Sequence, residues 1–141
     1  MLTWIAPPPD PRLAPDEAHA WLIPIDLTPR RLAEMAATLS SDEQARAARF
    51  HFERDRARYT VARGSLRRIL GLYLKRPPTE IAFVYSPYGK PALADDAPLA
   101  FNVSHAGEWA VCAVTWGARI GVDIEQIRPD LAGESIAEHF F

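Results

Sequence analysis

Two acidic residues near the C-terminal end of the sequence are separated by one apolar residue, in Gly121-Val122-Asp123-Ile124-Glu125. If this segment is a strand, its side chains alternate between faces, so Asp123 and Glu125 point the same way. Neighbouring carboxylates repel each other unless a cation lies between them. Mg²⁺ prefers oxygen ligands and usually takes one or two carboxylates together with waters and substrate phosphates. The spacing therefore predicts a Mg²⁺ site, and a solvent-facing acidic strand edge is the alternative.

A second group of polar residues ends the short segment Phe101-Asn102-Val103-Ser104-His105. Polar side chains at the end of a strand can face a ligand, but no aspartate is marked as a partner that would complete a catalytic triad. We therefore favour a hydrogen-bonding or phosphate-contacting role for Ser104 and His105 over a nucleophilic serine. Turn capping by Asn102 and Ser104 is the alternative that needs no ligand.

A lysine is displayed between glycine and proline in Tyr88-Gly89-Lys90-Pro91. A lysine on such a turn can meet a phosphate as a point charge. Exposed turn lysines are also common where no ligand binds, so this segment supports a phosphate site only in combination with the other two.

The stretch 44–76 is strongly basic, with ten Lys and Arg against two acids, although the chain as a whole has a formal net charge of −2. A basic segment in an acidic chain suggests an anionic ligand, and guanidinium groups match the geometry of phosphate. A solvated helix face rich in arginine is the alternative. Nucleic-acid binding is disfavoured, because the remainder is acidic and no known binding motif is present. The candidate phosphate-binding arginines are Arg46, Arg49, Arg56, Arg63 and Arg67.

The elements that position these residues predict an α+β fold with helices packed on a mainly antiparallel sheet. Ser40 and Glu43 have the spacing of a capping box that starts a helix, and a helix with an apolar stripe at three- and four-residue steps ends before Pro77. Pro24 marks the first strand as an edge strand, and Gly117-Ala118 predicts a hairpin between the last two strands. The expected strands are 20–25, 81–85, 101–105, 109–116 and 119–127, and the expected helices are 28–39, one from 40 onward, one over 59–76, and the opening of another at 134–141.

Size and composition fit one globular domain: 141 residues, 48% of them hydrophobic and 24% charged. The single cysteine, Cys112, excludes an intramolecular disulfide and a CxxC-type zinc site, and its apolar surroundings predict a buried, inert thiol. No apolar stretch approaches the roughly 20 residues of a membrane span. One cysteine and no signal peptide lead us to expect a cytoplasmic protein with no membrane partner.

The order of these segments resembles the Sfp-type 4′-phosphopantetheinyl transferases. The similarity covers about residues 20–141, and the motifs GKP, FNxSH and GxDIE in this order are highly specific together. The matching residues are Leu39-Ser40 with Glu43, Arg49-Phe50, Ala62-Arg63 with Leu66-Arg67, Gly89-Lys90-Pro91, Phe101-Asn102-Val103-Ser104-His105, Gly121-Val122-Asp123-Ile124-Glu125, and Ile136-Ala137 with Phe140-Phe141.

The resemblance implies a Mg²⁺-dependent enzyme that moves the phosphopantetheine arm of coenzyme A onto a serine of an acyl or peptidyl carrier protein. It also implies the fold of one half of a pseudo-dimer. By resemblance, Asp123 and Glu125 are the Mg²⁺ ligands, and together with His105 they are the catalytic residues. The expected coenzyme A contacts are Arg63, Lys90, Ser104 and His105, with Arg46 as a looser match to a residue that contacts the adenosine 3′-phosphate.

The sequence departs from the family pattern in one respect, because the W-x-x-K-E segment of the second half is absent from these 141 residues. The expected organisation is a proline-rich flexible arm at 1–17, an N-terminal-half domain at 18–130, and at 131–141 the start of a helix leading to a missing second half. We therefore expect weak or no activity of this chain alone, and possible self-association through the uncovered surface. The alternative is a non-catalytic module that binds coenzyme A or another nucleotide and needs a partner chain.

Overall fold

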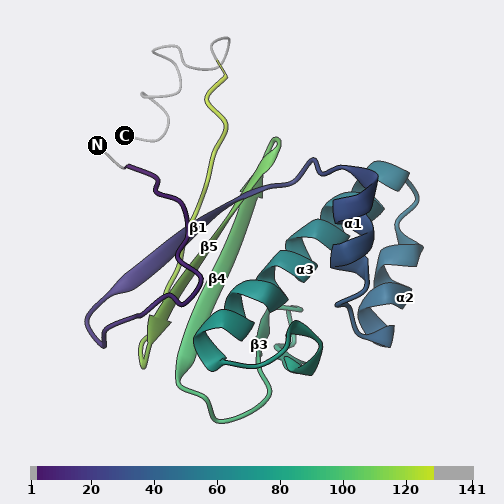
Figure 1. Cartoon of the computed structure of the whole chain (residues 1–141). Coiled ribbons are helices and arrows are strands. Elements are labelled where there is room, and N and C mark those ends of the chain that lie inside the picture. Colours follow the sequence, from purple (N-terminus) through teal and green to yellow (C-terminus); the bar gives the residue numbers. More distant parts are fainter. Residues whose placement is uncertain (1–2, 129–141) are drawn as a thin grey trace.

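The computed structural model describes residues 3–128 and confirms the α+β class. The three α-helices lie to one side of a three-stranded sheet, and a two-stranded sheet lies below α3 in the view of Figure 1. In chain order the elements are β1 (Ala18–Pro24), α1 (Pro29–Ala36), α2 (Ser41–Arg49), α3 (Glu53–Leu74), a short 3-10 helix η1 (Pro78–Glu80), β2 (Phe83–Tyr85), β3 (Pro91–Leu93), β4 (Leu99–Ala106) and β5 (Trp109–Trp116).

The helix starts follow from local capping. The Ser40 hydroxyl accepts a hydrogen bond from the Glu43 backbone N–H at 3.3 Å, and the Glu43 carboxylate accepts one from the Ser40 N–H at 2.9 Å. These two bonds are the predicted capping box, and they begin α2. At the other end of the helical region, α3 ends at Leu74, where Lys75 adopts a left-handed conformation with φ of 54°.

The main sheet has the antiparallel order β1-β5-β4, so β1 is an edge strand, as Pro24 predicted. Its inner face packs on the apolar stripe of α3, where Leu66, Ile69, Leu70 and Tyr73 are all buried. Cys112 lies in the middle of this core, and burial raises the pKa of its thiol to about 12. The prediction of a buried cysteine is therefore confirmed.

The predicted hairpin after β5 is wrong, because residues 119–127 form no strand. Both edges of β5 are already occupied, one by β1 and the other by β4, so the segment that follows β5 has no free edge of that strand to pair with. It lies beside β4 instead, where the Asn102 and Ser104 side chains bind its backbone.

The proline-rich segment 3–17 forms neither helix nor strand, and its later part lies against the sheet. The Trp116 indole donates a hydrogen bond to the Leu13 carbonyl, and the Thr115 hydroxyl donates one to the Glu17 carbonyl, both at 2.9 Å. The helix expected at 134–141 lies outside the described residues. Within the described part of the chain, none of the helices has the length and apolar character needed to cross a membrane.

Candidate functional site

The acidic segment 121–125 is fixed beside β4 by two polar side chains of that strand. Asn102 Oδ1 accepts a hydrogen bond from the Val122 backbone N–H at 2.9 Å, and Ser104 Oγ accepts one from the Ile124 N–H at 3.2 Å. The Ser104 hydroxyl also donates to Asp123 Oδ1 at 3.0 Å. A serine hydroxyl has one donor and two acceptor lone pairs, so both of its bonds can form together.

Exposure alternates along this segment. Asp123 and Glu125 are exposed, whereas Val122 and Ile124 are partly buried. Two exposed carboxylates leave room for the waters and phosphates that complete the coordination of Mg²⁺. Within residues 3–128 no group of three or more His, Cys, Asp and Glu side chains is placed to hold a metal ion. The two carboxylates therefore fit as two of the ligands of a Mg²⁺ ion, and the remaining coordination positions are left to other oxygen atoms.

His105 follows Ser104 on β4, so the two side chains leave opposite faces of the strand. His105 is exposed and shares its face with Phe101 and Val103, which pack in or against the core. A ligand that touched both Ser104 and His105 would therefore have to lie across the end of β4.

Arg63 is held inside a cluster of aromatic rings and acceptors. Its Nη1 donates to Glu43 Oε2 at 3.2 Å and to the Tyr85 hydroxyl at 2.6 Å. Its guanidinium carbon lies 5.2 Å from the ring centre of Phe83, and the rings of Tyr59 and Tyr85 are within 5.6 Å. The Arg63 side chain is 11% exposed, so for this residue the interpretation as a solvated surface arginine is wrong.

Arg67 and Glu43 form a buried ion pair one helical turn further along α3. Both side chains are 3% exposed, and Arg67 Nη2 lies 2.6 Å from Glu43 Oε1. Arg67 Nη1 also donates to the carbonyl oxygens of Pro78 and Ile81, at 2.9 and 2.6 Å. Glu43 is therefore the shared acceptor of two arginines, one of which holds the connection between α3 and β2.

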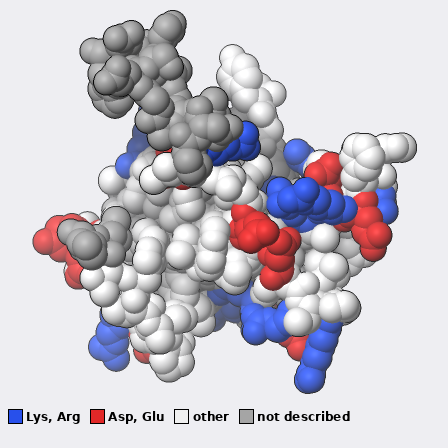
Figure 2. Space-filling model, turned by 90° about the horizontal axis from the view of Figure 1, so that it is seen from above, with Lys and Arg blue, Asp and Glu red and all other residues white. Residues whose placement is uncertain are grey.

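The other basic candidates lie around the same helices. The Arg46 guanidinium carbon lies 5.6 Å from the centre of the Tyr59 ring, which also contacts Arg63. Arg56 donates to the Phe50 carbonyl at 2.8 Å and so holds the junction of α2 and α3, while Arg49 is exposed. On the face shown in Figure 2, basic and acidic side chains interleave rather than gather by sign.

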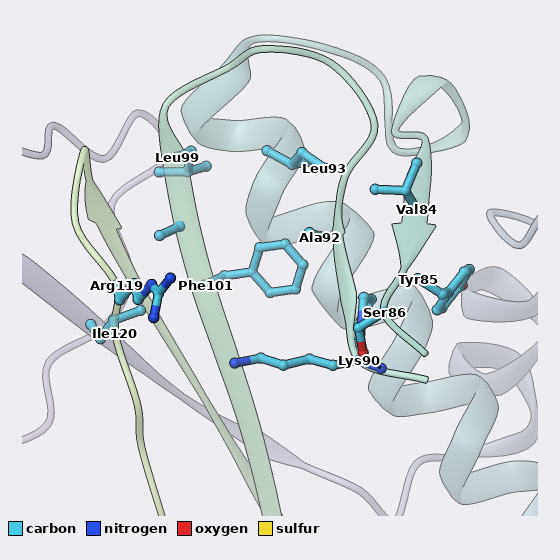
Figure 3. A pocket seen from close by; sticks show the side chains of 12 residues that line it. Val84, Tyr85, Ser86, Lys90, Ala92, Leu93, Leu99, Phe101, Arg119 and Ile120 are labelled. Carbon is cyan, nitrogen blue, oxygen red and sulfur yellow. Dashed lines mark hydrogen bonds between the residues drawn. The ribbon is translucent and has the colours of Figure 1, made fainter. Parts of the chain in front are cut away.

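Lys90 lies at the mouth of a cavity of about 530 Å³ between the β2–β3 hairpin and β4 (Figure 3). Its position depends on Ser86, whose hydroxyl accepts a hydrogen bond from the Lys90 backbone N–H at 3.1 Å and whose own N–H donates to the Lys90 carbonyl at 2.9 Å. Figure 3 shows the Lys90 side chain extended from the hairpin toward β4, the strand beside which Arg119 lies. The other side chains that line the cavity are largely apolar and include Leu93, Leu99 and Phe101.

The structure thus gathers the predicted site residues into two groups. Arg46 and Arg63 share the Tyr59 ring, and Tyr85 connects Arg63 to the cavity that Lys90 lines. Ser104 and Asp123 form the second group through their hydrogen bond, with His105 and Glu125 adjacent in sequence. β4 runs past both groups, because it lines the cavity near Phe101 and binds the acidic segment through Ser104.

A family model described as "4′-phosphopantetheinyl transferase, N-terminal" matches residues 26–117, which is more than half of the chain. The chain belongs to the 4′-phosphopantetheinyl transferase family. It is 47% identical over 142 residues to the 4′-phosphopantetheinyl transferase HetI of Nostoc sp., a match that covers 99% of this chain and 60% of the relative. It is 30% identical over 103 residues to the 4′-phosphopantetheinyl transferase Sfp of Bacillus subtilis, covering 73% of this chain and 45% of that relative.

A third relative is a phosphopantetheinyl transferase of Thraustochytrium sp., which is 32% identical over 134 residues, covering 89% of this chain and 46% of the relative. The chain therefore spans 60% or less of the length of these members of the phosphopantetheinyl transferase family. The family-model match contains β2, β3, β4 and α3, and it ends just before Arg119.

Sequence reasoning missed several residues that build the site in this phosphopantetheinyl transferase family member. The sequence predicted only a capping-box role for Glu43, although an acid three residues after Ser40 can take part in a capping box and in an ion pair at once. A signal for its second role was present, because Arg63 and Arg67 are four residues apart and so lie on one face of a helix. Tyr85 and Arg119 carried no pattern that marked them, and both line the cavity beside Lys90.

The hydrogen bonds that hold the acidic segment give a residue-specific prediction. Asn102→Ala should lower amide-exchange protection at Val122, and Ser104→Ala should lower it at Ile124, because each variant loses the acceptor of that N–H. A hydrogen bond worth about 1 kcal/mol corresponds to roughly a fivefold change in the opening equilibrium. Hydrogen–deuterium exchange measured by NMR tests this, and each variant serves as the control for the other. Equal loss of protection at both amides in either variant would contradict the assignment.

Proposed function

We propose that this chain supplies the coenzyme A- and metal-binding part of a Mg²⁺-dependent transfer of 4′-phosphopantetheine from coenzyme A to a serine of a carrier protein. The observation that carries the proposal is the acidic segment beside β4, where Asp123 is hydrogen-bonded to Ser104 and is exposed together with Glu125. Family membership supports the reaction class, and the relatives HetI and Sfp are named as 4′-phosphopantetheinyl transferases.

In this proposal Asp123 and Glu125 hold Mg²⁺, which when bound would neutralise charge on the diphosphate of coenzyme A. Ser104 orients the Asp123 carboxylate through its 3.0 Å hydrogen bond, in the way that residues around a metal site commonly orient its ligands. Lys90 and His105 contact phosphate oxygens as donors. Transfer between phosphate oxygens depends mainly on positioning and charge stabilisation, and these side chains can supply both.

Arg63 and Arg46 form the more distant part of the proposed coenzyme A site. Arg63 is preorganised by Glu43 and Tyr85, so its guanidinium loses little conformational freedom when it binds a phosphate. Arg46 is exposed and lies over the Tyr59 ring, which leaves its guanidinium edge open to an anion. We propose that these two residues contact the phosphorylated adenosine end of coenzyme A.

The partners proposed for the chain are coenzyme A and an acyl or peptidyl carrier protein, and the proposed location is the cytoplasm. Residues 1–141 contain no W-x-x-K-E segment, which the family resemblance ties to deprotonation of the carrier serine. We therefore propose that these residues by themselves bind coenzyme A and transfer its arm weakly or not at all. Self-association through exposed apolar surface is a further proposed property.

Two assays on the 141-residue polypeptide test the proposal. Isothermal calorimetry should detect coenzyme A binding that tightens at least about tenfold with Mg²⁺, and fluorescent coenzyme A should label a carrier protein at close to the background rate. Absence of coenzyme A binding both with and without Mg²⁺ overturns the proposed site. Rapid labelling by the 141 residues overturns the expectation that they are insufficient.

A mixing experiment separates an enzyme half from a non-catalytic binding module. The C-terminal part of a relative, added as a separate polypeptide, should raise labelling of the carrier protein if this chain supplies the coenzyme A site of an enzyme. Binding of coenzyme A with no labelling in any mixture would favour the module that only holds the nucleotide. The same C-terminal polypeptide without this chain is the control.

A further inference from the structure

The β2–β3 hairpin that carries Lys90 is attached to α3 at two points by arginines one helical turn apart. Arg67 donates to the carbonyl oxygens of Pro78 and Ile81, just before β2 begins. Arg63 donates to the Tyr85 hydroxyl at 2.6 Å, at the end of β2. The two arginines share the buried carboxylate of Glu43. They therefore hold both ends of the segment 78–85, which leads into and includes β2.

The Tyr85 contact differs from the Arg67 contacts in its surroundings. Arg67 is buried and binds backbone carbonyls, which makes it part of the folded core. Tyr85 is 46% exposed, and its hydroxyl is joined to the rest of the protein through Arg63. The bond between Tyr85 and Arg63 can therefore be removed with little effect on the core.

Tyr85 also lies next to Lys90 within the hairpin, so release of Tyr85 would change the position of Lys90. It pairs with Pro91 across the two-stranded sheet, and Pro91 directly follows Lys90. The next residue, Ser86, binds both the N–H and the carbonyl of Lys90. The two-stranded sheet has only three residues in each strand, and a two-stranded ribbon of that size is marginally stable without further contacts.

We propose that Tyr85 is a positioning residue, whose hydroxyl locks the β2–β3 hairpin onto Arg63 and so holds Lys90 where it binds a phosphate of coenzyme A. The inference rests on the proposed function, because it assigns Lys90 and Arg63 to one coenzyme A site. Tyr85 acts through the other two residues: it fixes the distance between a guanidinium on α3 and an ammonium on the hairpin. Two preorganised cations bind a multiply charged ligand more tightly than the same cations on a mobile hairpin, since less entropy is lost on binding.

The first test replaces only the hydroxyl. Tyr85→Phe keeps the ring that lies 5.6 Å from Arg63 and lines the cavity, and should weaken coenzyme A binding by about tenfold, the equivalent of one charge-assisted hydrogen bond. Tyr88→Phe is the matched control, because Tyr88 is 98% exposed on the same hairpin. A loss of affinity no larger in Tyr85→Phe than in Tyr88→Phe would overturn the proposal.

The second test asks whether Tyr85 acts through Lys90. In a double-mutant cycle with Lys90→Ala, removal of the Tyr85 hydroxyl should lower coenzyme A affinity clearly less than it does in the wild type, because one of the two cations that it positions is gone. A purely structural role of the hydroxyl would lower the affinity equally in both backgrounds, and that outcome would overturn the proposal. Thermal unfolding of each variant should change by only a few degrees.

A third measurement separates failure of this inference from failure of the proposed function. Amide exchange at Ser86 and Ala94, whose N–H groups donate to Lys90 and Ala82 within the hairpin, should be faster in Tyr85→Phe than in Tyr88→Phe without any ligand. Faster exchange in a protein that does not bind coenzyme A would contradict the proposed function, but it would support the role of the Tyr85–Arg63 hydrogen bond in holding the hairpin. Unchanged exchange would show that the Tyr85 hydroxyl does not hold the hairpin and would overturn the inference.

Discussion

Replacing Glu43 with alanine should lower the free energy of unfolding by about 3–5 kcal/mol, because it leaves two arginines near or in the core without their counter-charge. Arg67 is 3% exposed and has no solvent to replace the carboxylate, and Arg63 is 11% exposed. The substitution also removes the acceptor of the Ser40 N–H and so breaks the capping box of α2. The effect should therefore reach α2, α3 and the connection to β2 together.

Urea unfolding of Glu43→Ala and of a surface control measures this effect. Glu34→Ala removes a carboxylate that pairs with Arg30 at 3.6 Å on the exposed side of α1, and a pair of this kind contributes at most about 1 kcal/mol. The expected order is a large loss for Glu43 and almost none for Glu34. Similar small losses in the two variants would show that the buried network does not hold these helices together.

Neutralising the acidic pair should abolish the effect of Mg²⁺ on coenzyme A binding. In the double variant Asp123→Asn with Glu125→Gln, the affinity without metal should stay within about twofold of wild type, because both residues are exposed and their loss leaves the core intact. With Mg²⁺ the loss relative to wild type should equal the factor by which Mg²⁺ tightens wild-type binding, about tenfold or more, because the variant no longer gains from the metal.

A charge-matched control excludes a general electrostatic effect. Asp26→Asn with Glu34→Gln changes the net charge by the same amount at exposed positions outside the acidic segment. Calorimetric titration of coenzyme A with and without Mg²⁺ should give wild-type behaviour for this control. If both double variants lose the Mg²⁺ effect equally, Asp123 and Glu125 have no special part in metal binding.

Features that depend on neighbouring residues in the sequence were the ones predicted well. Ser40 and Glu43 form their capping box within one turn of chain, and the apolar stripe of α3 needs only the period of a helix, so both could be read directly. The edge position of β1 was signalled by Pro24, which cannot donate a hydrogen bond in the middle of a sheet. In each case the decisive interaction is local or is a property of one residue type.

Features decided by distant parts of the chain were missed or predicted wrongly. The turn at Gly117 suggested a hairpin, but β1, nearly a hundred residues earlier, pairs along one edge of β5 and β4 pairs along the other. Glu43 contacts arginines 20 and 24 residues away, a separation that no local pattern reveals. For the same reason the Tyr85–Arg63 bond could be found only in the folded protein.

The candidate site was predicted in part. Spacing placed Asp123 and Glu125 on one side of an extended segment, and their shared exposure agrees with that expectation. Spacing did not show that Ser104, 19 residues earlier, would lie against Asp123, because that contact depends on how the segment after β5 returns beside β4.

The most direct test of the proposed metal site measures whether the bound metal ion lies next to the diphosphate of coenzyme A. With Mn²⁺ in place of Mg²⁺, the ³¹P signals of the coenzyme A diphosphate should broaden strongly when the wild-type chain is present, beyond the broadening that Mn²⁺ causes in free coenzyme A. The Asp123→Asn, Glu125→Gln variant should show only the free-ligand broadening. Equal broadening with both proteins would contradict a metal site at these two carboxylates.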